Sequence, residues 1–149
     1  MEIVALFFLL GIFASLRRPS AEQTEQSSPN GEQSKDEGVG IVDVSVNEAY
    51  ELIRAHQDDP DFVVLDLRTP AEYAAGHLPG AELLNFYDPT FFNEIQKLDP
   101  NKTYLFYCAT GNRSRSTTEI MELLGFKKAY HIYQGITAWQ RHGLPIEFS

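Results

Sequence analysis

The pattern of apolar and polar residues divides the chain into three segments. Residues 3–16 are almost continuously apolar, residues 19–38 are polar without apolar periodicity, and residues 39–149 alternate between short apolar runs and amphipathic stretches. Short runs of β-branched and aromatic residues are typical of strands, whereas apolar residues that recur every three or four positions are typical of helices. The third segment is therefore predicted to be the folded domain.

Strand and helix signals alternate throughout residues 39–149. The pattern predicts strands at 41–44, 62–67, 104–107 and 129–133, and one more after Ala81. Helices are expected after Ser45 and after Thr69, each followed three positions later by the glutamate of a capping box. Three further helices are expected, at 88–98, after the loop that follows residue 107, and at 135–142. Such alternation indicates βα units with right-handed crossovers, and thus an α/β fold with a mostly parallel sheet of about five strands.

The N-terminal apolar run is short for a membrane span. Its 14 residues would reach about 21 Å as a helix, against roughly 30 Å of bilayer hydrocarbon. That length suits a signal peptide, so we expect residues 1–18 to direct export to the periplasm or cell exterior. Arg17 and Arg18 follow the run instead of preceding it, which favours the alternative of a membrane tether through residues 3–16 with a cytoplasmic domain. Residues 19–38 are predicted to be a disordered linker.

Composition limits the classes of function. A chain of 149 residues, 43% hydrophobic and 22% charged, has room for one ordinary globular domain. The net charge of −9 argues against a nucleic-acid partner. The single cysteine excludes a disulfide within this chain and a cysteine-rich metal site. Any thiol that reacts with it must therefore come from another molecule.

That cysteine, Cys108, stands where a predicted strand ends and a polar, glycine-containing loop begins. The loop amides and the helix N-terminus behind them would form an anion-binding nest, which lowers the pKa of a thiol from about 8.5. Arg113, five positions later, can hold an oxygen-rich anion with its planar donors. Ligands of parallel α/β folds bind beyond the carboxyl ends of the strands. The residues thus indicate nucleophilic attack by a thiolate on an anion.

Three stretches resemble the rhodanese family. Residues 108–113, Cys-Ala-Thr-Gly-Asn-Arg, match its six-residue loop in length, although many members carry a cation where this chain has Ala109. Residues 66–81, Asp-Leu-Arg-Thr-Pro-Ala-Glu-Tyr-Ala-Ala-Gly-His-Leu-Pro-Gly-Ala, closely resemble its motif upstream of the cysteine. Residues 135–139 resemble its C-terminal Gly-x-x-Ala-Trp pattern. The resemblance covers nearly all of residues 39–149 and implies a three-layer fold with helices on both faces of the sheet.

The resemblance also implies a function. It predicts a sulfurtransferase that moves sulfane sulfur from a small anionic donor such as thiosulfate, or from a persulfide, to cyanide or an external thiol, either small or on a protein. Cys108 would carry the sulfur as a persulfide, without a metal or organic cofactor. The residues expected to bind the substrate are Ala109, Thr110, Gly111, Asn112, Arg113 and Ser114 in the loop, together with Arg68 upstream.

Other functions are compatible with a reactive cysteine. A sulfur carrier or binding module would share Cys108 but would not turn over. Phosphatases and arsenate reductases of the cysteine-loop type have five residues between cysteine and arginine, whereas four intervene here and Ser114 stands where their arginine would be. A cysteine protease would need His77 or His131 beside the thiol as a base, which the sequence cannot show.

Overall fold

The computed structural model describes residues 40–149. The signal peptide or anchor expected at 1–18, the linker expected at 19–38 and the first residue of the predicted domain lie outside the described residues. Within residues 40–149, no helix combines the length and the apolar character needed to cross a bilayer.

Five strands form one sheet in which every pairing is parallel. The strands are β1 Gly40–Val44, β2 Phe62–Asp66, β3 Glu82–Leu83, β4 Thr103–Tyr107 and β5 Lys128–Ile132, in the order β1-β5-β4-β2-β3. The predicted parallel sheet of about five strands is confirmed. The strand expected after Ala81 is only two residues long and lies at the sheet edge with both residues exposed.

Residues 40–149 contain five helices, four of which connect successive strands and the last of which follows β5. They are α1 Val46–Ala55, α2 Pro70–Ala74, α3 Phe91–Lys97, α4 Asn112–Leu123 and α5 Gly135–Arg141. Both predicted capping boxes are present, because Ser45 and Thr69 each accept a hydrogen bond from the amide of the glutamate three positions later. The helix expected from residue 88 begins only at Phe91, since the Asp88 carboxylate accepts the Thr90 amide and holds a turn before it.

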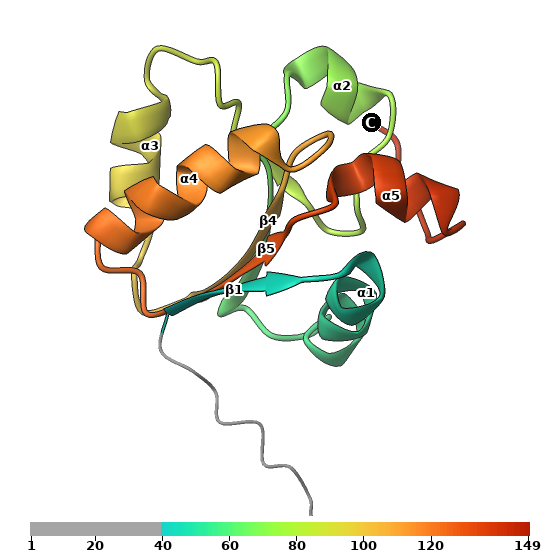
Figure 1. Cartoon of the computed structure of the whole chain (residues 1–149), viewed down its shortest axis with the longest axis horizontal. Coiled ribbons are helices and arrows are strands. Elements are labelled where there is room, and N and C mark those ends of the chain that lie inside the picture. Colours follow the sequence, from blue (N-terminus) through green and yellow to red (C-terminus); the bar gives the residue numbers. More distant parts are fainter. Residues whose placement is uncertain (1–39) are drawn as a thin grey trace, which may run out of the picture. The chain divides into compact units, whose positions relative to one another are not determined.

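Helices cover both faces of the sheet, as Figure 1 shows. Side chains of α1 and α5 pack on one face in a core that includes Trp139, and those of α3 and α4 pack on the other in a core that includes Met121. Residues of β4 alternate between these cores, because successive side chains of a strand point to opposite faces. Leu105 and Tyr107 belong to the α1/α5 side, whereas Cys108 belongs to the α3/α4 side. The sheet therefore delivers the cysteine to the N-terminal end of α4.

Candidate active site

Cys108 directly follows β4, the central strand of the sheet, and only 1% of its surface is exposed. Burial of this degree is common for structural cysteines. The surroundings of the thiol are different, however, because polar groups of the following loop converge on the sulfur. The Gly111 amide donates a hydrogen bond to Sγ at 3.2 Å, and the Ser114 hydroxyl lies 3.4 Å from the same atom.

These contacts oppose the effect of burial on the thiol. Burial raises the pKa of Cys108, but hydrogen bonds from the Ser114 hydroxyl and from the amides of Ser114, Thr110 and Gly111 lower it more, so that the pKa lies below its ordinary value. The amides belong to the loop and to the first turn of α4, whose N–H groups have no partner within the helix. The expected nest of amides around the sulfur is therefore present.

The loop can turn this tightly because of two glycines. Gly111 has a φ of 96°, and a Cβ atom built there would lie 2.1 Å from the Tyr133 carbonyl oxygen. Gly135 has a φ of 66°, and its Cβ would lie 2.3 Å from the Ala109 carbonyl oxygen. Both the left-handed conformation and the close backbone approach require glycine. The backbone of the cysteine loop is thus in close contact with the backbone around the start of α5.

The first amides of α5 hold the opposite side of the loop. Ile136 donates its amide to the Cys108 carbonyl at 2.9 Å, and Thr137 donates to the Ala109 carbonyl at 3.0 Å. These two carbonyls are thereby bound to α5, while the loop amides are directed at the sulfur. The Gly-x-x-Ala-Trp motif consequently supports the cysteine loop from behind.

Arg113 forms a two-point ion pair with Glu72 of α2. Its terminal nitrogens lie 2.9 and 2.7 Å from the two carboxylate oxygens, and its guanidinium lies over the Tyr87 ring. The pair lowers the pKa of Glu72 to about 2 and raises that of Arg113. Glu72 also accepts the Thr69 amide at the start of α2, so one carboxylate fixes both the helix and the arginine. Binding of a donor anion by Arg113 stays a prediction.

Arg68 is buried, with 5% of its surface exposed. Its guanidinium donates to the Asp66 carboxylate and to the Gly76 carbonyl, and it lies over the ring of Tyr107. The Tyr107 hydroxyl donates to the same carboxylate. These contacts give Arg68 a structural task in joining β2, β4 and α2, and its predicted contact with the anion is not among them.

The other predicted loop residues differ in exposure. Thr110 and Asn112 are exposed, Ala109 is half-buried, and Gly111 is buried against the segment before α5. His77 stacks on Tyr73, and its Nδ1 lies 3.0 Å from the Tyr73 carbonyl oxygen. No cluster of three His, Cys, Asp or Glu side chains that could hold a metal occurs among residues 40–149.

The structure also places two further residues near the sulfur: His131, which the sequence offered only as a possible protease base, and Asp43, which the sequence did not identify. His131 of β5 has its Nε2 2.8 Å from the Ser114 hydroxyl oxygen and its Nδ1 2.8 Å from the Asp43 carboxylate of β1. Ser114 thus lies between the sulfur and the imidazole. Asp43 is paired directly with His131 across neighbouring strands, although 88 positions separate them in the chain. Only the strand order reveals this arrangement.

Comparison with known proteins agrees with the geometry. The sequence model of the rhodanese-like domain family matches residues 45–142. A sulfurtransferase of Allochromatium vinosum is 37% identical over 90 residues, which are 60% of this chain and 81% of that protein. A solved structure of a polysulfide-sulfur transferase homodimer from Wolinella succinogenes is similar with a TM-score of 0.58 and 27% identity, covering 73% of this chain and 80% of the other.

Some relatives are much longer proteins. A tRNA uridine(34) hydroxylase of Pectobacterium carotovorum subsp. carotovorum is 34% identical over 126 residues, which are 73% of this chain. The match spans only 35% of the hydroxylase. The similarity therefore concerns one part of that protein.

Proposed function

The chain belongs to the rhodanese-like domain family, and on that premise we propose that it is a sulfurtransferase that works through a persulfide on Cys108. The Gly111 amide and the Ser114 hydroxyl directed at Sγ carry this proposal. Such donors favour the thiolate, which is the nucleophilic form of cysteine. The sulfurtransferase and polysulfide-sulfur transferase among its relatives support the same chemistry.

The proposed reaction has two steps. The Cys108 thiolate attacks the outer sulfur of thiosulfate, the sulfur–sulfur bond of the donor breaks, and sulfite leaves with the bonding electrons. An acceptor, either cyanide or a thiolate, then attacks the outer sulfur of the persulfide and regenerates the Cys108 thiolate. Because Cys108 is the only cysteine of the chain, a thiol acceptor must come from another molecule. Loop amides that stabilise the thiolate would stabilise the persulfide anion in the same way.

Loop length favours sulfur over phosphate as the transferred group. Four residues separate Cys108 from Arg113, and the loop is closed tightly enough that Gly111 leaves no room for a side chain. A small ring of amides suits a single sulfur atom better than a tetrahedral oxyanion. We therefore place phosphatase or arsenate reductase activity second to sulfur transfer.

Intact-mass measurement tests the first step. Incubation with thiosulfate should add the mass of one sulfur atom to the wild-type chain, and cyanide should remove it again. Cys108→Ser is the control and should gain no mass. Absence of the added sulfur together with hydrolysis of a phosphate ester would overturn the proposal.

Turnover separates an enzyme from a sulfur carrier. With thiosulfate and cyanide in excess, the proposed enzyme forms many equivalents of thiocyanate per chain. A carrier would load once and release its sulfur only to a dedicated partner. A single equivalent of product in this assay would assign the chain to the carrier class.

A further inference from the structure

A chain of hydrogen-bonding groups leads from the active-site sulfur to the surface on the β1 side of the sheet. Ser114 lies 3.4 Å from Sγ, His131 lies 2.8 Å from Ser114, and Asp43 lies 2.8 Å from His131. His131 is 1% exposed, whereas the Asp43 side chain is 55% exposed. The buried sulfur is thus connected to solvent through one hydroxyl, one imidazole and one carboxylate.

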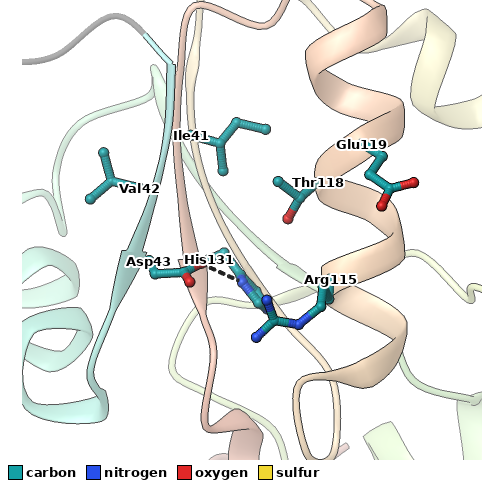
Figure 2. Close-up of a pocket in the computed structure, with 7 residues that line it drawn as sticks. All are labelled: Ile41, Val42, Asp43, Arg115, Thr118, Glu119 and His131. Atoms are coloured by element: carbon teal, nitrogen blue, oxygen red, sulfur yellow. Dashed lines mark hydrogen bonds and ion pairs between the residues drawn. The ribbon is translucent and has the colours of Figure 1, made fainter.

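The surface end of this chain opens into a pocket of about 590 Å³ between β1 and α4. Figure 2 shows the Asp43–His131 contact among the residues that line this pocket, with Arg115 of α4 extending toward the imidazole. Glu119 lines the pocket from the same helix. The pocket lies at the sheet edge formed by β1, so the carboxylate of Asp43 that contacts His131 is open to solvent.

The protons carried by Cys108, Ser114, His131 and Asp43 depend on one another through their hydrogen bonds. The Ser114 hydroxyl has one proton and three acceptors near it, namely Sγ, the Gly111 carbonyl oxygen at 3.1 Å and His131 Nε2. An ionised carboxylate only accepts hydrogen bonds, so Nδ1 of His131 must carry a proton to bind Asp43. If Ser114 donates to the sulfur, Nε2 must also carry a proton, and the imidazole is then a cation. If Ser114 donates to Nε2, the imidazole is neutral and the sulfur loses this donor.

We propose that Ser114, His131 and Asp43 form a proton relay that receives the proton of the Cys108 thiol. The S–H bond breaks as the proton passes to Ser114 Oγ, and the proton that Ser114 held passes to His131 Nε2. No electrons are transferred, and total charge is unchanged: a neutral thiol and a neutral imidazole become a thiolate and an imidazolium. Asp43 stabilises the imidazolium, and Ser114 afterwards donates to the thiolate. His131 and Asp43 act through Ser114 and are positioning residues.

Charged side chains of two elements lie near His131. Asp43 on β1 is in direct contact with the imidazole, and α4 presents Arg115 and Glu119 to the same pocket. On β4, the neighbour is the uncharged ring of Phe106, which stacks on the imidazole. The group in direct contact is thus a carboxylate, which accepts the hydrogen bond from Nδ1 and leaves Nε2 facing Ser114.

The use of the relay in sulfur transfer rests on the proposed function, but ionisation of the thiol can be measured without any sulfur donor. The experiment records the rate at which iodoacetamide alkylates Cys108 in the full chain as a function of pH. Asp43→Asn keeps the size of the side chain and its oxygen acceptor but removes the charge. Because Asp43 is half exposed, this variant is expected to fold. Glu119→Gln is the matched control, since it removes one negative charge from the same pocket without touching His131.

Asp43→Asn is expected to lower the alkylation rate about tenfold at about pH 7, because the relay would no longer favour the Cys108 thiolate, and a rise of one unit in the pKa of that thiol reduces the thiolate fraction about tenfold. The rates of the variant and the wild type should converge at high pH, where the thiol ionises without help. A merely structural role would not produce this convergence. Equal pH profiles for Asp43→Asn, Glu119→Gln and the wild type would overturn the relay.

The imidazole provides a second, independent measurement. Nitrogen-15 NMR of His131 should show an imidazolium when Cys108 is a thiolate and a neutral ring after alkylation has removed the negative charge. An unchanged ring signal would overturn the relay even if the sulfur-loading assay succeeds. Conversely, a chain that takes no sulfur from thiosulfate but shows the shifted alkylation profile would overturn the proposed function and leave the relay standing.

Discussion

Two arginine–carboxylate pairs lie near the carboxyl ends of the neighbouring strands β2 and β4, and their surroundings differ. Asp66 is the last residue of β2, and Arg68 comes two positions later; their side chains are 0% and 7% exposed. Arg113 and Glu72 join the cysteine loop to α2, with exposures of 14% and 35%. Both pairs bring a guanidinium close to a carboxylate, at 2.6 and 2.7 Å. Only the second pair touches the loop that holds Cys108.

The difference shows how position assigns a role to the same two residue types. The Arg68–Asp66 pair, here called the inner pair, has further partners. Asp66 also accepts a hydrogen bond from the Tyr107 hydroxyl, and Arg68 also donates to the Gly76 carbonyl. In a buried pair of this kind the mutual attraction offsets the cost of removing both charges from water, and loss of one partner leaves an uncompensated charge. The Arg113–Glu72 pair, here called the outer pair, is partly exposed to solvent, so a dissolved anion can compete with Glu72 for the guanidinium. The inner pair therefore supports the fold, and the outer pair is the one that we propose to respond to a substrate.

Removal of Arg68 is expected to have the largest effect on stability. Arg68→Ala should lower the free energy of unfolding by about 3–5 kcal/mol, because Asp66 would stay buried without its cation. Urea denaturation followed by circular dichroism measures this change. Arg113→Ala, in the same experiment, should cost only about 1 kcal/mol. Equal losses for the two variants would remove the distinction between an inner and an outer pair.

Removal of Arg113 should instead affect the reaction. Arg113→Ala is expected to raise KM for thiosulfate about tenfold to a hundredfold, since charge-assisted hydrogen bonds to an anion contribute about 1.5–3 kcal/mol. Steady-state formation of thiocyanate provides the measurement. Arg54→Ala on α1, which removes an equal charge far from the loop, is the control and should leave KM unchanged. An unaltered KM in Arg113→Ala would exclude this residue from donor binding.

Loss of the negative charge of Glu72 is expected to have the smallest effect, a small decrease in the free energy of unfolding. Its pKa of about 2 lies below the ordinary 4.5, so its ion pair stabilises the fold above about pH 4.5, and this contribution is lost as the pH falls toward 2. Glu72→Gln keeps a capping side chain but loses the charge. We expect it to be about 1 kcal/mol less stable than the wild type near neutral pH, a value reduced for the partial exposure of the pair.

Denaturation of both proteins across the acidic range measures this contribution. The difference in the free energy of unfolding should shrink as the pH falls and vanish near the folded-state pKa. A difference that stays constant with pH would assign the effect to packing instead of charge.

Much of the site could be predicted because it depends on residues close together in the chain. The capping boxes of Ser45 and Thr69 follow from spacing of three residues, and both are present. The family, predicted from the cysteine loop and two further motifs, is confirmed. The partner of Arg68 could not be predicted, because a charged residue at a strand end can face either the anion or the interior. In the structure it pairs with Asp66, and its contact with a donor anion stays a prediction.

The amino-acid sequence by itself determined the alternation of strands and helices, the family and the cysteine on which the proposed chemistry depends. These features arise from local periodicity, capping and turn preferences, which are properties of neighbouring residues. Tertiary structure alone decided which distant groups meet: Glu72 with Arg113, and Asp43 with His131 beside Ser114. The order β1-β5-β4 brings the first and last strands together next to the central one. Contacts of that kind depend on how strands are arranged across the sheet, and no local pattern encodes that arrangement.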